Sequence, residues 1–261
     1  MNKHISKLLL VAISSTFFST AICAQHGKYV GGDISMLPQY EKHNSPYLDA
    51  NSQPIDDLIT WLIEECGWNT FRIRLFVDPY NPTDPCVCQD LEYVKQLGKR
   101  IKDAGAYFML DYHYSDSWVD ATHIQAPRAW KDCTVDQKVD SITAYTRTTL
   151  QELIAYGAAP DMVQVGNEIM YGFMGVSVHP YANAADDWDG FLKILKAGCL
   201  TVREMLPNAQ IIIHTDRLSN QKYNQFYYGK LVENGVDFDV IGLSYYPFWH
   251  GYLTAEQATA N

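Results

Sequence analysis

After residue 28 the chain alternates short apolar runs with longer segments that carry apolar residues at every third or fourth position. A short run rich in β-branched and aromatic residues predicts a strand, and the wider spacing predicts an amphipathic helix. The predicted strands cover residues 29–34, 69–77, 106–112, 161–166, 210–214 and 238–246. The predicted helices cover residues 55–66, 91–104, 139–154, 188–206 and 223–233, the first starting after Pro54.

Strands that alternate with helices, without a hairpin signal, predict a parallel sheet with helical crossovers. Such a sheet is either open and doubly wound or closed into a barrel. The glycine fingerprint of nucleotide binding is absent after the first strand, which disfavours the open sheet. Polar and aromatic residues follow every predicted strand, and in a (β/α)8 barrel these ends form one face. We therefore expect an α/β fold of the (β/α)8 barrel type, with about six βα units in this chain.

The composition excludes some classes of protein. Hydrophobic residues make up 47% of the chain, as in a globular protein with a large core. Thirty acidic against 20 basic residues give a formal net charge of −10, which disfavours nucleic acid as a partner. Aromatic residues reach 13%, a share that suits a packed core as well as flat surfaces for sugars.

The N-terminus has the order of a signal peptide. Lys3 and Lys7 precede the apolar run 8–13, and small residues follow at 19–21. We expect residues 1–24 to be removed and the mature domain, residues 25–261, to be secreted, periplasmic or at the cell surface. Cys23 raises lipid anchoring as an alternative, although Ile22 before it fits that signal poorly. No other stretch is apolar enough to cross a membrane.

Export permits disulfides, and the mature chain keeps five cysteines. Cys86 and Cys88 fall in one predicted loop and Cys133 in a later one, so a loop-to-loop bridge is plausible. Cys66 and Cys199 fall on apolar helix faces and are expected as buried thiols. The spacing of Cys86 and Cys88 does not match zinc sites, and Asp-x-His alone is a weak metal signal. We expect no metal and no cofactor.

The segment Gly166-Asn167-Glu168 carries the strongest catalytic signal. It follows an apolar strand, so Glu168 should lie partly desolvated at the barrel mouth, as suits a general acid. Asn167 beside it is placed to hold a substrate hydroxyl. An isolated Asn-Glu pair is usually a simple strand end, but polar residues at the neighbouring strand ends favour function here.

Other polar residues fall at the same face. Arg72 and Arg74 share one side of a strand and must pair with carboxylates near the mouth, unless one of them points into the helix layer. The block 111–118 places an acid, an imidazole and aromatic rings together, which favours sugar binding over metal binding. His214 and Asp216 repeat the acid–imidazole pattern on the fifth strand.

Six of these strand-end motifs, in order, resemble those of glycoside hydrolase family 53, the arabinogalactan endo-β-1,4-galactanases. The family belongs to a clan of retaining (β/α)8 hydrolases. The resemblance implies internal cleavage of β-1,4-galactan such as pectin side chains, by a monomer without a membrane span. The motifs are Gly31–Leu37, Arg72–Pro79, Asp111–Trp118, Val165–Ile169, Ile213–Asp216 and Gly242–Trp249.

The resemblance also implies roles for residues. Glu168 matches the family's acid/base, Asn167 a sugar contact, and Arg72 the arginine of the clan's second strand. Tyr245 or Tyr246 would lie near the nucleophile, and three tryptophans, Trp118, Trp130 and Trp249, are candidates for sugar stacking. The full set expected to bind substrate is Asp33, Arg72, Arg74, Asp111, His113, Trp118, Asn167, His214, Asp216, Tyr246 and Trp249.

The sequence departs from the family in one respect. The family's nucleophile is a Glu after the seventh strand, and we find neither that strand nor that Glu here. Thr254 and Gln257 have capping-box spacing, so a helix is expected to begin there. We expect a C-terminally truncated barrel that is inactive by itself. The alternatives are another hydrolase of the clan, such as a mannanase or xylanase, and a non-catalytic sugar-binding barrel.

Overall fold

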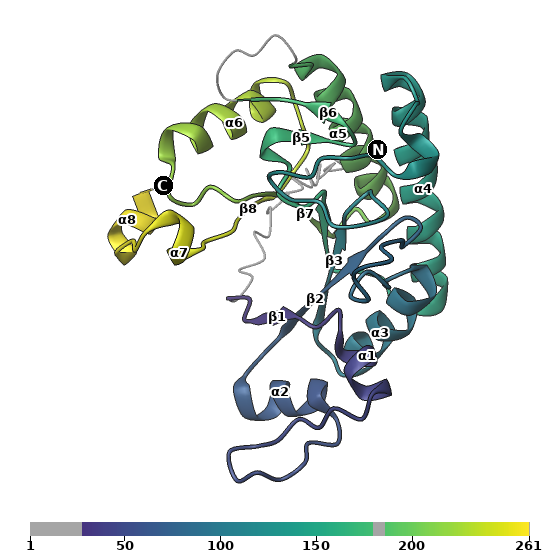
Figure 1. Ribbon diagram of the computed structural model, residues 1–261, viewed down its shortest axis with the longest axis vertical. Coiled ribbons are helices and arrows are strands. Elements are labelled where there is room, and N and C mark those ends of the chain that lie inside the picture. Colours follow the sequence, from purple (N-terminus) through teal and green to yellow (C-terminus); the bar gives the residue numbers. More distant parts are fainter. Residues whose placement is uncertain (1–27, 180–185, 261) are drawn as a thin grey trace, which may run out of the picture.

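The computed structural model describes residues 28–179 and 186–260, so the expected signal peptide and Cys23 lie outside the described residues. The main sheet has six parallel strands in the order β1-β2-β3-β4-β7-β8. In Figure 1 the sheet is curled, with helices along its outer side. The strands are β1 Gly31–Asp33, β2 Thr70–Leu75, β3 Tyr107–Tyr112, β4 Met162–Val165, β7 Gln210–Thr215 and β8 Val240–Leu243. All six predicted strands are confirmed, most of them shorter than expected.

A small antiparallel hairpin was not expected from the sequence. It consists of β5 (Gly172–Phe173) and β6 (Val176–Ser177), inserted after β4. Each strand has only two residues, which is too short for any alternating pattern to reveal. The prediction that the chain has no hairpin is therefore wrong at this point.

The helices lie along the convex side of the sheet except the last two, which lie beyond its β8 edge (Figure 1). They are α1 Leu37–Lys42, α2 Leu58–Cys66, α3 Leu91–Asp103, α4 Val135–Tyr156, α5 Trp188–Met205, α6 Gln221–Glu233, α7 Pro247–His250 and α8 Ala255–Ala260, with 3-10 turns η1 Arg128–Trp130 and η2 Ile169–Tyr171. Helix α2 begins at Leu58 and not after Pro54, because Asp57 caps it by accepting from the Ile59 amide. The expected capping box is confirmed, since Thr254 and Gln257 exchange hydrogen bonds before α8.

The two sides of the sheet carry different residues. In β2 the alternate residues Phe71, Ile73 and Leu75 are fully buried in the hydrophobic core. Arg72 and Arg74 have the opposite parity and line a cavity on the concave side. Period-2 alternation therefore places both arginines inside the curled sheet, and the alternative of an arginine in the helix layer is wrong.

The cysteines test the expected disulfide and the expected buried thiols, and the helices can be searched for a membrane span. All five described cysteines are free thiols, so the plausible bridge from Cys86 or Cys88 to Cys133 does not form. Cys199 is buried as expected, whereas Cys66 is exposed, because it ends α2 beside the left-handed Gly67. None of the helices in the described ranges is long and apolar enough to cross a membrane.

Candidate active site

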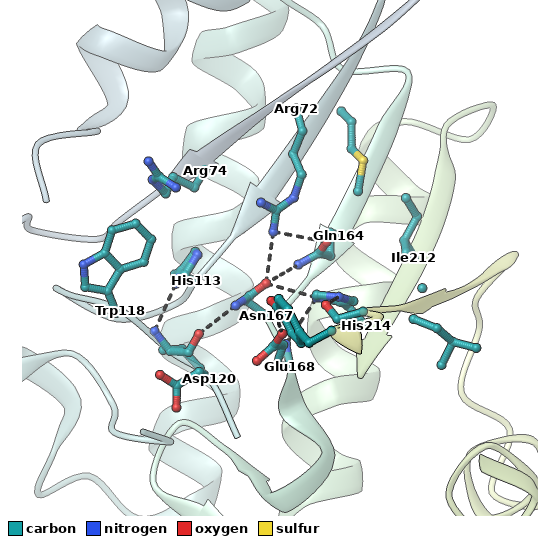
Figure 2. A pocket seen from close by; sticks show the side chains of 16 residues that line it. Arg72, Arg74, His113, Trp118, Asp120, Gln164, Asn167, Glu168, Ile212 and His214 are labelled. Carbon is teal, nitrogen blue, oxygen red and sulfur yellow. Dashed lines mark hydrogen bonds between the residues drawn. The ribbon is translucent and has the colours of Figure 1, made fainter. Parts of the chain in front are cut away.

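A cavity of about 570 Å³ opens on the concave side, toward the carboxyl ends of the parallel strands (Figure 2). That volume lies in the range of small-molecule sites. Its wall combines polar groups from five strands and the segments after them with the indole of Trp118. The lining residues are Arg72, Arg74, Met109, His113, Trp118, Val119, Asp120, Gln164, Asn167, Glu168, Ile212, His214, Gly242, Leu243, Ser244 and Tyr246.

Glu168 stands on a strained turn after β4. Gly166 has φ 85°, and a Cβ there would lie 2.6 Å from the Ile169 side chain. Glu168 itself is left-handed, at φ 47° and ψ 47°, a conformation that costs a non-glycine residue about 1 kcal/mol or more. The turn brings the Glu168 side chain to the cavity, where its Oε1 accepts from the Tyr246 hydroxyl at 3.1 Å.

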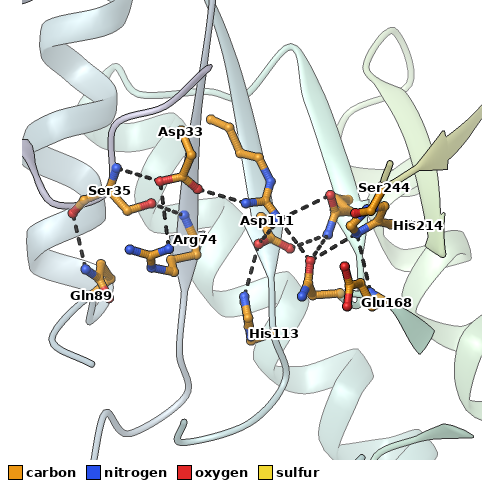
Figure 3. A network of polar contacts seen from close by, with 12 residues as sticks. Asp33, Ser35, Arg74, Gln89, Asp111, His113, Glu168, His214 and Ser244 are labelled. Carbon is orange, nitrogen blue, oxygen red and sulfur yellow. Dashed lines mark hydrogen bonds and ion pairs between the residues drawn. The ribbon is translucent and has the colours of Figure 1, made fainter. Parts of the chain in front are cut away.

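The ion pairs beside Glu168 centre on Arg72 (Figure 3). Its Nη1 lies 2.8 Å from Asp33 Oδ2, and its Nη2 lies 2.5 Å from Asp111 Oδ2. Asp111 is fully buried, and burial is the largest single influence and would raise its pKa. The Arg72 charge, together with His113 and His214, outweighs burial and lowers that pKa to about 2. The expected pairing of the arginines with carboxylates near the mouth is confirmed.

Arg74 is held more loosely than Arg72. Its Nη1 lies 3.8 Å from Asp33 Oδ1, and its guanidinium stacks 4.4 Å from the centre of the Trp118 ring. The Trp118 indole donates to Asp84 at 2.7 Å, which fixes the ring against rotation. Arg74 therefore covers part of Trp118, while both residues still line the cavity.

The neutral form of His214 bridges two strands. Its Nδ1 lies 3.0 Å from Asn167 Oδ1, an obligate acceptor, and its Nε2 lies 2.8 Å from the Ser244 hydroxyl. The Glu168 amide also points at Nδ1, from 3.4 Å. We place the proton on Nδ1 because the contact with Asn167 Oδ1 is the shorter of the two, and Ser244 then donates to Nε2. Burial, helped by the nearby Arg72 charge, lowers the pKa of His214 to about 4.

His113 contacts the Asp111 carboxylate, which also pairs with Arg72. Its Nδ1 accepts from the Val119 amide at 3.2 Å, so its Nε2 carries the proton and points at Asp111 Oδ2, 3.2 Å away. Asp111 thus sits beneath the cavity rather than in its wall, between an arginine and an imidazole. Its position suits charge balance and not direct contact with a ligand.

The remaining expected residues divide into near and remote positions. Asp33 pairs with Arg72 and does not line the cavity, and Asp216 is buried next to Arg217, 3.0 Å away. Trp249, in α7, is 77% exposed and is not among the cavity residues. Trp130 packs edge-on against Tyr145. Of the three tryptophans expected at the site, only Trp118 is there.

The structure adds residues that the sequence analysis did not select. Gln164 and Ser244 join the polar network, and Asp120, Met109 and Ile212 line the cavity. Gln164 had a usable signal, because it is a polar residue inside the otherwise apolar strand β4. Among the residues described, no three His, Cys, Asp or Glu side chains converge as a metal site requires.

Comparison with known proteins agrees with this geometry. The model of glycosyl hydrolase family 53 matches residues 29–260. The chain belongs to that family. Its relatives include the endo-β-1,4-galactanase of Bacillus subtilis, 29% identical over 96% of this chain and 56% of that protein. Another is the arabinogalactan endo-β-1,4-galactanase of Cellvibrio japonicus, 32% identical over 94% of this chain and 63% of that protein.

Solved structures support the same assignment of fold. The family 53 catalytic domain of Ignisphaera aggregans superposes with a TM-score of 0.76 at 32% identity, over 85% of this chain and 60% of that one. A fungal β-1,4-galactanase superposes with a TM-score of 0.73 at 27% identity, over 85% and 64%. The six strands are thus part of a (β/α)8 barrel fold, and this chain spans about 60% of the length of these relatives.

Proposed function

We propose that this protein is a retaining glycosidase that cleaves internal β-1,4-galactosidic bonds in galactan and type I arabinogalactan, the side chains of pectin. Family membership and the named activities of the galactanase relatives support the substrate. The observation that carries the catalytic part concerns Glu168. It lines the cavity and forms no ion pair with any described residue, while Asp33 and Asp111 are both paired to Arg72.

This difference matters because a general acid must give up a proton and take it back. Asp111, with its pKa near 2, stays ionised and cannot serve as that acid at neutral pH. Glu168 has only the Tyr246 hydroxyl on Oε1, which leaves its second oxygen available to carry the proton. In the first step that proton passes to the glycosidic oxygen as the bond to C1 breaks. In the second step Glu168 takes a proton from the attacking water.

Retention also requires a nucleophilic carboxylate about 5–5.5 Å from the acid/base. Asp120 is the other carboxyl in the cavity wall, but its Oδ1 caps the turn to His123 and its Oδ2 pairs with His123. We assign Asp120 no part in bond cleavage. The described residues thus supply the acid/base half of the pair, and the nucleophile stays the strand-seven Glu that the family resemblance implies.

The polar residues beside Glu168 would hold the sugar. Asn167 lies next to it, and one of its two Nδ2 hydrogens is used by the Val119 carbonyl at 2.7 Å. The other hydrogen is free to bind a sugar hydroxyl, and in glycosidases hydrogen bonds to the 2-hydroxyl strengthen in the transition state. Trp118 supplies the apolar surface for a sugar ring.

The test is hydrolysis of galactan, mannan and xylan by the purified full-length protein, which is the parent in all the assays below, and by its Glu168→Gln variant. Glu168→Gln should lower the rate on galactan by about 10²–10⁴-fold, and much less for an aryl galactoside whose leaving group needs no proton. Glu204→Gln, an exposed carboxyl paired with Arg147 on the helix layer, is the matched control. Glu168→Gln that cleaves galactan at the parent rate would refute the assignment. Preference for mannan or xylan, or binding without cleavage, would establish one of the alternatives.

Export completes the proposal. Removal of residues 1–24 would release a monomeric domain, residues 25–261, into an extracytoplasmic space where polysaccharide is accessible. N-terminal sequencing of the mature protein tests the cleavage, and light scattering tests the monomer. A retained N-terminus, or a lipid on Cys23, would replace secretion by retention at a membrane.

A further inference from the structure

The side-chain amide of Asn167 is held in a single orientation by its neighbours. Its Oδ1 accepts from Arg72 Nη2 at 3.0 Å, from Gln164 Nε2 at 3.2 Å and from His214 Nδ1 at 3.0 Å (Figure 2). With three donors on the oxygen, the Nδ2 group must face the opposite way, toward Val119 and the cavity. The hydrogen available to a ligand is therefore aimed by residues that do not themselves need to touch the ligand.

Gln164 is the side-chain amide among these three donors, and it lies in β4. Only 2% of its surface is exposed. Its Nε2 lies 2.6 Å from Asp111 Oδ1, 3.0 Å from the Gly166 carbonyl and 3.2 Å from Asn167 Oδ1. Its Oε1 faces the Arg72 guanidinium, 3.5 Å away. Three acceptors around the nitrogen and a cation at the oxygen allow one orientation of the Gln164 amide.

A glutamine suits this position better than any residue of similar shape. A carboxylate would place an acceptor against Asp111 and two carbonyl oxygens, and an apolar side chain would leave Asp111 Oδ1 without its donor. Either change removes one restraint on Asn167, the residue next to Glu168. The links run within one layer of the barrel, because Asp111 and Gln164 are register partners on β3 and β4.

We propose that Gln164 is a positioning residue, which aims the Asn167 amide at the substrate by linking it to the Arg72–Asp111 ion pair. The inference rests on the proposed function, since it assigns to Asn167 the contact with the 2-hydroxyl of the reacting sugar. The competing explanation is that Gln164 only stabilises the fold. The two explanations predict different rates on substrates with and without the 2-hydroxyl when Gln164 is replaced.

The experiment compares the parent with Gln164→Leu on two substrates, an aryl β-1,4-galactobioside and its analogue without the 2-hydroxyl on the reacting sugar. On the first, kcat should fall by about 10²-fold with little change in KM, as expected for a misplaced catalytic contact. On the deoxy analogue the two proteins should differ far less, because the contact that Gln164 organises is already absent. Equal losses on both substrates would refute the proposal.

A matched control addresses folding. Gln210→Leu makes the same change at the start of β7, in a residue that does not line the cavity and whose Oε1 has no hydrogen-bond partner. It should leave both rates unchanged. If Gln164→Leu does not fold, Gln164→Glu replaces it: the charged form repels Asp111, whereas the protonated form can donate one hydrogen bond. Its activity relative to the parent should rise as pH falls, and a ratio that stays flat with pH would contradict the proposal.

A second measurement does not depend on activity. In the parent, the side-chain amide of Asn167 should give slowly exchanging proton signals in NMR spectra, and Gln164→Leu should speed up their exchange while Gln210→Leu does not. A parent that fails to cleave galactan but shows this pattern would refute the proposed function and keep the positioning role. If the parent cleaves galactan but its Asn167 signals are unchanged in Gln164→Leu, the positioning role is refuted and the proposed function is kept.

Discussion

The low pKa of His214 predicts an acid sensitivity of the fold at a pH above the range in which Asp111 titrates. In the folded protein the pKa is about 4, because the ring is buried and the Arg72 charge is near. In the unfolded chain it returns to about 6.5. Between these values the unfolded state binds a proton that the folded state does not, so stability falls as pH falls from about 6.5 toward 4.

The size of the effect follows from those two values. Lowering the pH from 7 to 5 should cost about 2 kcal/mol of unfolding free energy through this one imidazole. Asp111 does not titrate between pH 7 and pH 5. Its pKa of about 2 in the folded protein lies below its unfolded value, so its contribution to the unfolding free energy is intact above about pH 4 and is lost only as the pH falls further. The range from pH 7 to 5 therefore isolates His214 from Asp111.

The assay is urea unfolding followed by tryptophan fluorescence, at pH 7 and pH 5, for the parent and His214→Gln. Glutamine does not titrate, so the variant should lose less stability over this interval than the parent by about 2 kcal/mol. His43→Gln, an exposed histidine at the end of α1, should show the parent's dependence. Groups common to all three proteins cancel in the comparison. A His214→Gln variant with the same pH dependence as the parent would refute the burial argument.

Three further changes test other parts of the structure. Trp118→Ala should weaken galactan binding measured by calorimetry by about 1–3 kcal/mol, by analogy with base stacking, and unchanged affinity with a large loss of stability would mark Trp118 as a core residue. Asp111→Asn leaves the Arg72 charge poorly compensated and should cost about 3–5 kcal/mol in urea unfolding, so a loss under 1 kcal/mol would contradict the ion-pair description. Gly98→Ala places a Cβ 2.7 Å from the Phe108 ring and should lower stability by about 1–3 kcal/mol, whereas a rise in melting temperature would mean that the helix-to-sheet contact is looser than described.

The architecture was predictable because each element carries its own periodic signal. Six apolar runs separated by amphipathic segments predict parallel strands with crossovers, and the shared polarity of the strand ends predicts one functional face. The same logic placed Arg72 and Arg74 on one side of β2. The start of α2 was not predictable, since Pro54 is as good a signal as the Asp57 cap that the chain uses.

Parts of the site depend on contacts that sequence periodicity does not encode. The sequence does not show which carboxylate each arginine contacts. Arg72, for example, pairs with Asp33, which lies 39 positions earlier in the chain. The left-handed turn at Glu168 is a non-glycine exception that no local rule predicts. Trp130 and Trp249 are candidates that the family resemblance implies, and neither their type nor their place in the chain tells a packed ring from one that faces a ligand.

Site residues are better predicted by combining two features: the side of the sheet that a strand residue faces, and the order of the strands in the sheet. The register aligns Arg74, Asp111, Gln164 and Ile212 across four neighbouring strands, so their side chains form one row on the concave side. A polar residue in this row, inside a strand as apolar as β4, must be satisfied by its neighbours in the row, and this criterion would have selected Gln164 from the sequence. The charge balance of the site includes residues outside this row. Two arginines face two aspartates, the imidazole of His214 is neutral, and Glu168 lies outside the ion pairs.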